Sequence, residues 1–336
     1  MTARRFRRLL WAYPRSYRAE HGAEIVTTLL DMAEAGRGRP GVALHLVLCG
    51  LRQRFRLPGG RPLPWIAAVL AAVALGGFGS AAGTWLGWQT AASVPSDREL
   101  RALNATLTGM PADAAVYREK SAMQGPNALV RADGTANFSA ERVRAALTSS
   151  GWNVTLLTTR PGAIVVNLKT EEQVPTENVS YTATKGRLKM EGGGSVIVGG
   201  QDRGLLGEAS YATAVWPAEA AAVRPMTIGG LLAGAVAGWW LTAAFAYRIR
   251  RSGPPGRWAA TALSTVGLVA AAVPVYRLYR DAYQVMVYAQ GSPYPYIVDG
   301  PSDGTLALTC TVVGLLAVVG ALVSARPRPA ATPATG

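Results

Sequence analysis

Four long uncharged runs dominate the pattern of apolar and polar positions along this chain. No Asp, Glu, Lys, Arg or His falls within residues 62–96, 225–247, 258–276 or 304–325. About 20 apolar residues in an α-helix cross a hydrocarbon core of about 30 Å, and each run has at least 19 residues. The pattern therefore predicts four transmembrane helices, over residues 62–90, 225–247, 258–276 and 304–325.

Ahead of the first run, apolar residues recur at helical spacing in three short segments, which Pro14 and Pro40 separate. The first segment has an apolar face of Phe6, Leu9, Leu10 and Tyr13. The second repeats Ala23, Val26, Leu29, Leu30 and Ala33, and the third, "VALHLVLCGLRQRFRL", is apolar and then basic. We predict a helical head over residues 1–61.

This head is expected to dock on the anionic inner leaflet of a membrane. The apolar face of the first helix would enter the lipid, and basic side chains would lie at the headgroups. The arginines assigned to this role are Arg4, Arg5, Arg7, Arg8, Arg52, Arg54 and Arg56. A cytoplasmic protein partner is the alternative for the same surface, and a purely topological role for the arginines is a third possibility.

The stretch "LLWAYPRSYRAEHGAEIVTTLLD" resembles the start of a set of uncharacterised multi-pass membrane proteins of actinobacterial type. It also resembles, more loosely, the helical prefix of some bacterial ABC-type permeases. The residues that carry the pattern are Tyr13, Pro14, Tyr17, Arg18, Gly22 and Glu24. "PMTIGGLLAGAVAGWWLTAAFAYRIRR" is similar to the second span of the same set. The resemblance implies a membrane protein and implies no activity.

Between the first two runs, residues 91–224 have the length and polarity of one folded domain. Ser96 with Glu99 forms a capping box for a helix, and Ser139 caps a second helix that Gly151 ends. Strand-like runs follow, in the order "WNVTLLTT", "AIVVNLKT", "NVSYTATKGRLKM", "SVIVG" and "ASYATAVW". We expect an α+β module with an antiparallel sheet, hairpin turns at "RPG" and "KG", and a hairpin or mobile loop at "MEGGGSVIVGGQ".

Charge gives the expected orientation. Residues 1–61 hold 12 basic and 4 acidic residues, the loop 248–257 holds 4 basic residues, and the tail 326–336 adds 2. The 91–224 module and the segment 277–303 are near neutral. The positive-inside rule therefore places both termini and the 248–257 loop in the cytoplasm, in a cytoplasmic (inner) membrane, with a disordered tail after residue 325. This distribution accounts for the net charge of +14 without a nucleic-acid partner.

Candidate chemistry is sparse in this sequence. The α+β module holds no His or Cys, and no hydrolase, zinc-protease or phosphate-loop motif occurs in the chain. His21 and His45 are two potential metal ligands where three or four are usual, so we expect no metal and no cofactor. A carboxylate-dependent hydrolase would have to draw on acids such as Asp133, Glu171 and Glu172.

Two rows of glycine occur at four-residue spacing, one in each of the first two spans. They are Gly79, Gly83 and Gly87, and Gly230, Gly234 and Gly238. Such rows let two helix backbones approach closely. We expect these two spans to pack on each other at the base of the α+β module.

The segment 277–303 and the end of the third run are rich in tyrosine. An aromatic belt at the membrane interface is one interpretation, and a partner platform is the other. The platform would comprise Tyr279, Tyr283, Tyr288, Tyr294 and Tyr296.

Together these observations favour a non-enzymatic integral membrane protein. It would act as a sensor or accessory subunit that couples an extracytoplasmic module to a cytoplasmic head, with a membrane-protein partner or a second copy of itself. The first alternative is a component of a permease-type transport complex, and the second is the carboxylate-dependent hydrolase. No Asp, Glu, Lys, Arg or His falls inside the four runs, and this weighs against ion-coupled transport.

Overall fold

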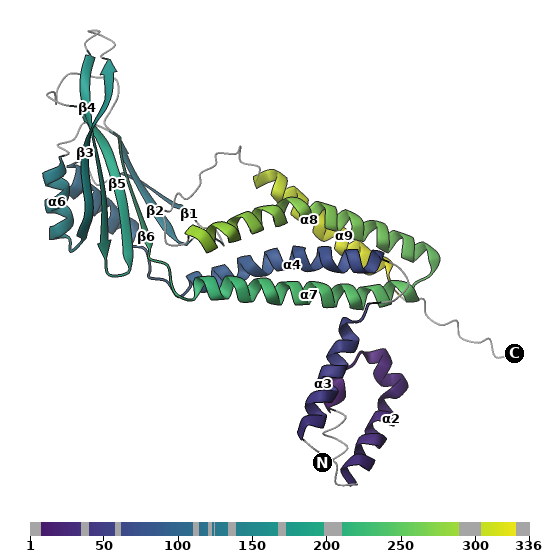
Figure 1. The fold of residues 1–336 in the computed structure, drawn as a ribbon. Coiled ribbons are helices and arrows are strands. Elements are labelled where there is room, and N and C mark those ends of the chain that lie inside the picture. The colour runs from purple at the N-terminus through teal and green to yellow at the C-terminus, as the bar shows by residue number, and fades with distance from the viewer. Residues whose placement is uncertain are drawn as a thin grey trace. The chain divides into compact units, whose positions relative to one another are not determined.

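A computed structural model describes residues 8–34, 40–57, 62–109, 114–119, 123, 125–133, 139–166, 173–197, 210–288 and 304–326. Four helices in these residues are long and apolar enough to cross a membrane. They are α4 (Leu63–Trp88), α7 (Val223–Arg251), α8 (Pro254–Tyr288) and α9 (Gly304–Ser324). An α+β module lies between α4 and α7 in the chain (Figure 1).

The chain divides into two compact units. One comprises residues 1–79, 231–278 and 301–336, and the other comprises residues 80–230 and 279–300. The division falls within α4, α7 and α8, so each of these helices contributes to both units.

The head consists of a 3-10 turn, η1 (Leu10–Ala12), and two helices, α2 (Arg15–Glu34) and α3 (Pro40–Phe55). As predicted, Pro14 precedes one helix and Pro40 opens the next. Leu10, Tyr13 and Val26 form the core of the head, together with Ile25, Leu30 and Leu46. The structure differs here from the sequence-based interpretation, because Leu10 and Tyr13 are 5% and 7% exposed and face this core rather than lipid. Phe6 lies outside the described residues.

The sheet module, residues 97–217, contains six antiparallel strands in the spatial order β1-β2-β6-β5-β4-β3. The strands are β1 (Ala115–Glu119), β2 (Asn127–Asp133), β3 (Asn153–Val166), β4 (Gln173–Lys185), β5 (Leu188–Ile197) and β6 (Ser210–Pro217). The turn at "KG" is confirmed, since Lys185 pairs with Leu188 and Gly186 has a φ of +58°. The prediction of a turn at "RPG" is wrong, because Pro161 lies inside β3, where the register with β4 shifts between Pro161 and Ile164.

Two helices supply the other half of the module core. They are α5 (Asp97–Thr108) and α6 (Ala140–Ser149), and both predicted N-caps are confirmed: Ser96 and Glu99 form a capping box, and Ser139 accepts from the Arg142 N–H. Leu100, Leu107, Val143 and Leu147 are buried against the sheet. Figure 1 shows α6 lying along one face of the strands.

The glycine-rich stretch "EGGG" is part of β5 and is not a loop. Gly192 pairs with Tyr181 of β4 on one side and Thr213 of β6 on the other. The Tyr181 hydroxyl reaches across β5 to the Thr213 hydroxyl, 2.7 Å away. A Cβ at Gly192 would overlap the Tyr181 hydroxyl, so only glycine leaves room for this hydrogen bond. Burial raises the pKa of Tyr181 to about 12, which keeps its hydroxyl protonated.

The helices α8 and α9 contact each other through small residues. A Cβ at Gly267 would lie 3.5 Å from the Gly314 carbonyl oxygen, and one at Gly256 would lie 2.7 Å from the Ser324 carbonyl oxygen. Arg248, at the end of α7, donates to the carbonyl oxygens of Ala325 and Leu322, 3.0 Å and 3.2 Å away. A cation thus satisfies the last carbonyls of α9. The predicted loop 248–257 is mostly helix, because α7 ends at Arg251 and α8 begins at Pro254.

Candidate functional site

The helices α4 and α7 lie side by side (Figure 1), and their contact in the unit that holds the sheet module is glycine-lined. A Cβ at Gly83 would overlap the Met226 carbonyl oxygen and lie 3.3 Å from the Gly230 Cα. A Cβ at Gly87 would lie 2.7 Å from the Val223 Cα. These atoms belong to the backbone, so the contact admits no side chain at either glycine.

A buried pair of hydroxyls lies in the same contact. Thr84 and Thr227 are 0% and 2% exposed, and their Oγ1 atoms are 2.7 Å apart. Each hydroxyl is also 2.8 Å from a carbonyl oxygen of its own helix, Ser80 for Thr84 and Val223 for Thr227. A hydroxyl carries one hydrogen, so only one of the two can donate across the interface while the other donates within its helix. Sequence reasoning missed this pair, although small residues at four-residue spacing include threonine.

In the other unit, α7 presents Gly234 and Gly238 to α4. A Cβ at Gly234 would overlap the Leu75 carbonyl oxygen and lie 3.2 Å from the Gly76 Cα. A Cβ at Gly238 would overlap the Ala71 carbonyl oxygen and lie 2.9 Å from the Ala72 Cα. The structure therefore brings five of the six predicted glycines into this contact. Gly79 is half-buried in α4, and Gly76, which the four-residue spacing did not select, faces α7 instead.

The sheet module is attached to α4 by side chains at the end of that helix. The Trp88 indole donates to the Met123 carbonyl oxygen at 3.1 Å, and a Cβ at Gly125 would lie 2.8 Å from the Trp88 ring. Beyond α4, Arg118 of β1 donates to Asp97 at 2.6 Å and to the Pro95 carbonyl oxygen at 2.5 Å.

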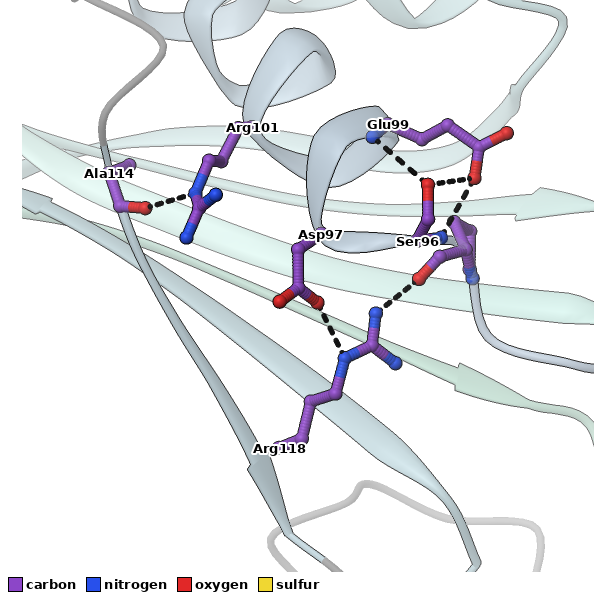
Figure 2. Close-up of polar contacts among 7 residues, drawn as sticks. Ser96, Asp97, Glu99, Arg101, Ala114 and Arg118 are labelled. Carbon is purple, nitrogen blue, oxygen red and sulfur yellow. Dashed lines mark hydrogen bonds and ion pairs between the residues drawn. The ribbon is translucent and has the colours of Figure 1, made fainter.

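Figure 2 shows Arg118 beside the capping box at the start of α5, where Glu99 accepts from the Ser96 N–H and hydroxyl at 2.7 Å and 2.8 Å. These hydrogen bonds lower the pKa of Glu99. Arg101 of the same helix donates to the Ala114 carbonyl oxygen at 3.1 Å. The linker that follows α4 is therefore held against β1 and the first turn of α5.

The connection from β6 back to α7 carries an ion pair. Arg224 Nε lies 2.9 Å from Glu219 Oε1, and the Glu219 side chain is only 7% exposed. Its Oε2 atom is buried without a hydrogen-bond partner among the described residues. The return path from the sheet is thus fixed by a largely buried carboxylate that depends on one arginine.

The head is attached to α7 and α4 at the end of α3. The Trp239 indole donates to the Phe55 carbonyl oxygen at 3.0 Å, and Leu57 packs with Ala68 and Ala243. The Arg54 guanidinium lies 5.4 Å from the centroid of Trp240 and 5.8 Å from that of Trp11. Arg54 also donates to the carbonyl oxygens of Trp11 and Tyr13, and desolvation lowers its pKa. Of the predicted docking arginines, Arg54 therefore contacts other residues of the protein with its guanidinium group.

The other predicted docking residues are distributed differently. Arg8, Arg52 and Arg56 are exposed, and Arg4, Arg5 and Arg7 lie outside the described residues. Of the tyrosine platform, Tyr283 is 63% exposed and Tyr279 is half-buried, both within α8. Tyr288 ends α8, and Tyr294 and Tyr296 lie outside the described residues. The helix α8 passes through Pro274 and continues 12 residues past the predicted end of the third span at residue 276.

The structure describes three of the residues considered for catalysis and metal binding, His21, His45 and Asp133. The His21 ring is tilted against the Tyr17 ring with centroids 4.7 Å apart, and His45 lies 3.4 Å from the Cys49 sulfur. No cluster of three or more His, Cys, Asp and Glu that could hold a metal occurs in the described part of the chain. Asp133 is the last residue of β2, and Glu171 and Glu172 lie outside the described residues.

Comparison with known proteins identifies no relative: neither the family models, nor the curated proteins, nor the solved structures give a match to this chain.

Proposed function

We propose that this chain is a non-enzymatic multi-pass protein of the cytoplasmic membrane that couples an extracytoplasmic sheet module to a cytoplasmic basic head, as a sensor or as an accessory subunit of a membrane complex. The observation that carries the proposal is the helix pair α4 and α7. Each of these two helices is attached to the sheet module near one end and to the head near the other.

Three features of the pair support transmission along it. The backbones touch at Gly83 and Gly87 in one unit and at Gly234 and Gly238 in the other, so neither helix can move there without displacing its partner. On the module side, Trp88 contacts residues 123 and 125. On the head side, Trp239 holds the last residue of α3. The helices α4 and α7 contribute to both units, and along them a change in the sheet module would bias the head.

Hydrogen exchange on the full chain in lipid nanodiscs tests the coupling. Gly83→Leu forces the two helices apart on the module side, and Gly229→Leu is the matched control because nothing lies within 4 Å of a Cβ at Gly229. Coupling predicts faster exchange in the last turns of α3 for G83L and unchanged exchange there for G229L. Faster exchange that stays within α4, α7 and the module would contradict the proposal.

The orientation is tested separately, in a chain whose two cysteines, Cys49 and Cys310, are replaced by serine. Thr28 of the head and Ser195 of the sheet module are both exposed and accept a single introduced cysteine. A membrane-impermeant maleimide added to intact cells is expected to label Ser195→Cys and to spare Thr28→Cys until the cells are lysed. The reverse pattern would overturn the positive-inside assignment.

A further inference from the structure

One face of α3 is apolar and is not used by the head. Gly50 contacts Ala12 and Tyr13, and Leu46 and Cys49 pack on the head core, which defines the inward face of the helix. The opposite face carries residues at the helical spacing i, i+4, i+7 and i+11, namely Leu44, Leu48, Leu51 and Phe55. Leu44 and Leu48 are 64% and 55% exposed. We call these four residues the α3 stripe.

The α3 stripe leads into an open groove of about 480 Å³ between α4 and α7. Phe55 belongs to both, and the remaining lining residues, Ala72, Ala235, Val236 and Trp239, come from the two spanning helices. The Trp239 indole donates to the Phe55 carbonyl oxygen, so the end of the stripe is fixed at the groove. All five lining residues are apolar, which suits a hydrocarbon chain. A helix or a second protein chain would need a larger surface.

Charge and aromatic residues mark the depth of this groove in a bilayer. Trp65 packs edge-on against Trp239 at 5.5 Å, and Trp65 and Trp240 are 51% and 40% exposed. Trp65 lies near the start of α4, and tryptophan at the end of a spanning helix is typical of the headgroup region. Arg52 and Arg56 are exposed. Arg52 follows Leu48 by four residues and so borders the stripe, and Arg56 comes directly after Phe55, beyond the end of the helix. The helix α3 contains no acidic residue to neutralise them.

We propose that the groove and the α3 stripe bind one anionic phospholipid of the adjoining leaflet. The acyl chain lies in the groove against Phe55 and Trp239, and Arg52 and Arg56 hold the phosphate. The site uses apolar surface that two membrane-spanning helices share with α3, and its two cations complement the charge of the headgroup. It is independent of the coupling function, because it depends on the groove, the α3 stripe and the two arginines and not on any response of the head.

Native mass spectrometry of the full chain, released from micelles that contain phosphatidylglycerol and phosphatidylcholine in equal amounts, tests the headgroup preference. The wild type is expected to retain one phosphatidylglycerol. The Arg52→Gln/Arg56→Gln variant removes two cations near the headgroup and is expected to weaken that retention by about 30-fold. Arg250→Gln/Arg251→Gln removes the same charge from exposed positions at the end of α7 and is expected to change nothing.

Photocrosslinking tests the groove itself. Phosphatidylglycerol with a diazirine on its acyl chain is expected to label peptides that contain Phe55 and Trp239, and Ala235→Phe, which fills the groove, is expected to abolish this labelling. Should that variant fail to fold, the positions of the crosslinks in the wild type still show whether the acyl chain lies in the groove. Equal retention of the two lipids, unchanged retention in R52Q/R56Q, or crosslinks spread over all spanning helices would each overturn the proposal. A dimer that A235F dissociates would assign the groove to a second copy instead.

Discussion

Replacing Gly83 by alanine gives the sharpest test of the close contact between α4 and α7. The added Cβ would overlap the Met226 carbonyl oxygen, lie 2.8 Å from the Met226 carbonyl carbon and lie 3.3 Å from the Gly230 Cα. All three atoms belong to the backbone of α7, so no side-chain rotation can relieve the overlap. Overpacking of this kind costs about 1–3 kcal/mol.

The same substitution at Gly229 provides the reference, because a Cβ there meets nothing within 4 Å. Both substitutions gain about 1 kcal/mol from the higher helix propensity of alanine. This gain cancels in the difference between the two variants. We therefore expect G83A to be less stable than G229A by about 1–3 kcal/mol, equivalent to about a 5- to 150-fold change in the unfolding equilibrium constant.

The measurement is a titration of the full chain in mixed micelles with sodium dodecyl sulfate, followed by tryptophan fluorescence and far-ultraviolet circular dichroism. The midpoint of G83A should fall below that of the wild type, and the midpoint of G229A should equal or exceed it. Equal free energies of unfolding for the two variants would refute the argument that α4 and α7 touch through their backbones at Gly83.

Three further predictions concern the sheet module in the full chain. Gly192→Ala places a Cβ against the Tyr181 hydroxyl, and urea unfolding of the sheet should show a loss of about 1–3 kcal/mol. The hydrogen bonds from Ser96 lower the pKa of Glu99. The stability that they contribute is fully present above the ordinary pKa of 4.5 and is lost as the pH falls through the lowered pKa. Melting temperatures of Glu99→Gln should therefore fall less steeply at acidic pH than those of the wild type. Arg118→Gln breaks a partly exposed ion pair, so it should cost less than about 1 kcal/mol at low ionic strength and much less in 1 M salt.

The spanning helices and the helix caps of the module could be read from the sequence because their signals are local. An uncharged run of 19 or more residues has few other folded solutions, and Ser96 and Ser139 lie within three residues of the N–H groups that they cap. The same local signals gave the start of α3 at Pro40. Local signals of this kind do not predict contacts between residues that are distant in the chain.

Several of the corrections involve contacts between segments that are distant in the chain. Leu10 and Tyr13 have the spacing of an exposed amphipathic face, but α2 and α3 cover them, and periodicity identifies a face without identifying what covers it. Gly192 was assigned to a hairpin or loop because the sequence does not show that Tyr181 of the neighbouring strand β4 occupies the space of a Cβ at this position. The strands β1 and β2 were missed because they are short, at five and seven residues, and form edge and near-edge strands of the sheet.

The candidate site was predicted only in part for the same reason. The glycine rows indicated that two spans approach each other, but the four-residue spacing did not select Gly76, whose Cα would lie 3.2 Å from a Cβ at Gly234. Trp88, Trp239 and Arg54 carry the attachments to the module and the head, and each acts on a backbone carbonyl or a ring contributed by another segment. No spacing rule within one helix identifies such partners.

The separation of α4 and α7 in the chain has a consequence for biosynthesis. Trp88 ends α4 and Val223 begins α7, so the ribosome adds more than 130 residues between them, which takes roughly 7–26 s at about 5–20 residues per second. During this interval the buried Thr84 hydroxyl has no partner from α7. It donates to the Ser80 carbonyl oxygen of its own helix at 2.8 Å, and Thr227 later does the same with Val223. Each of these two hydroxyls therefore has a hydrogen-bond partner within its own helix before α4 and α7 pack together.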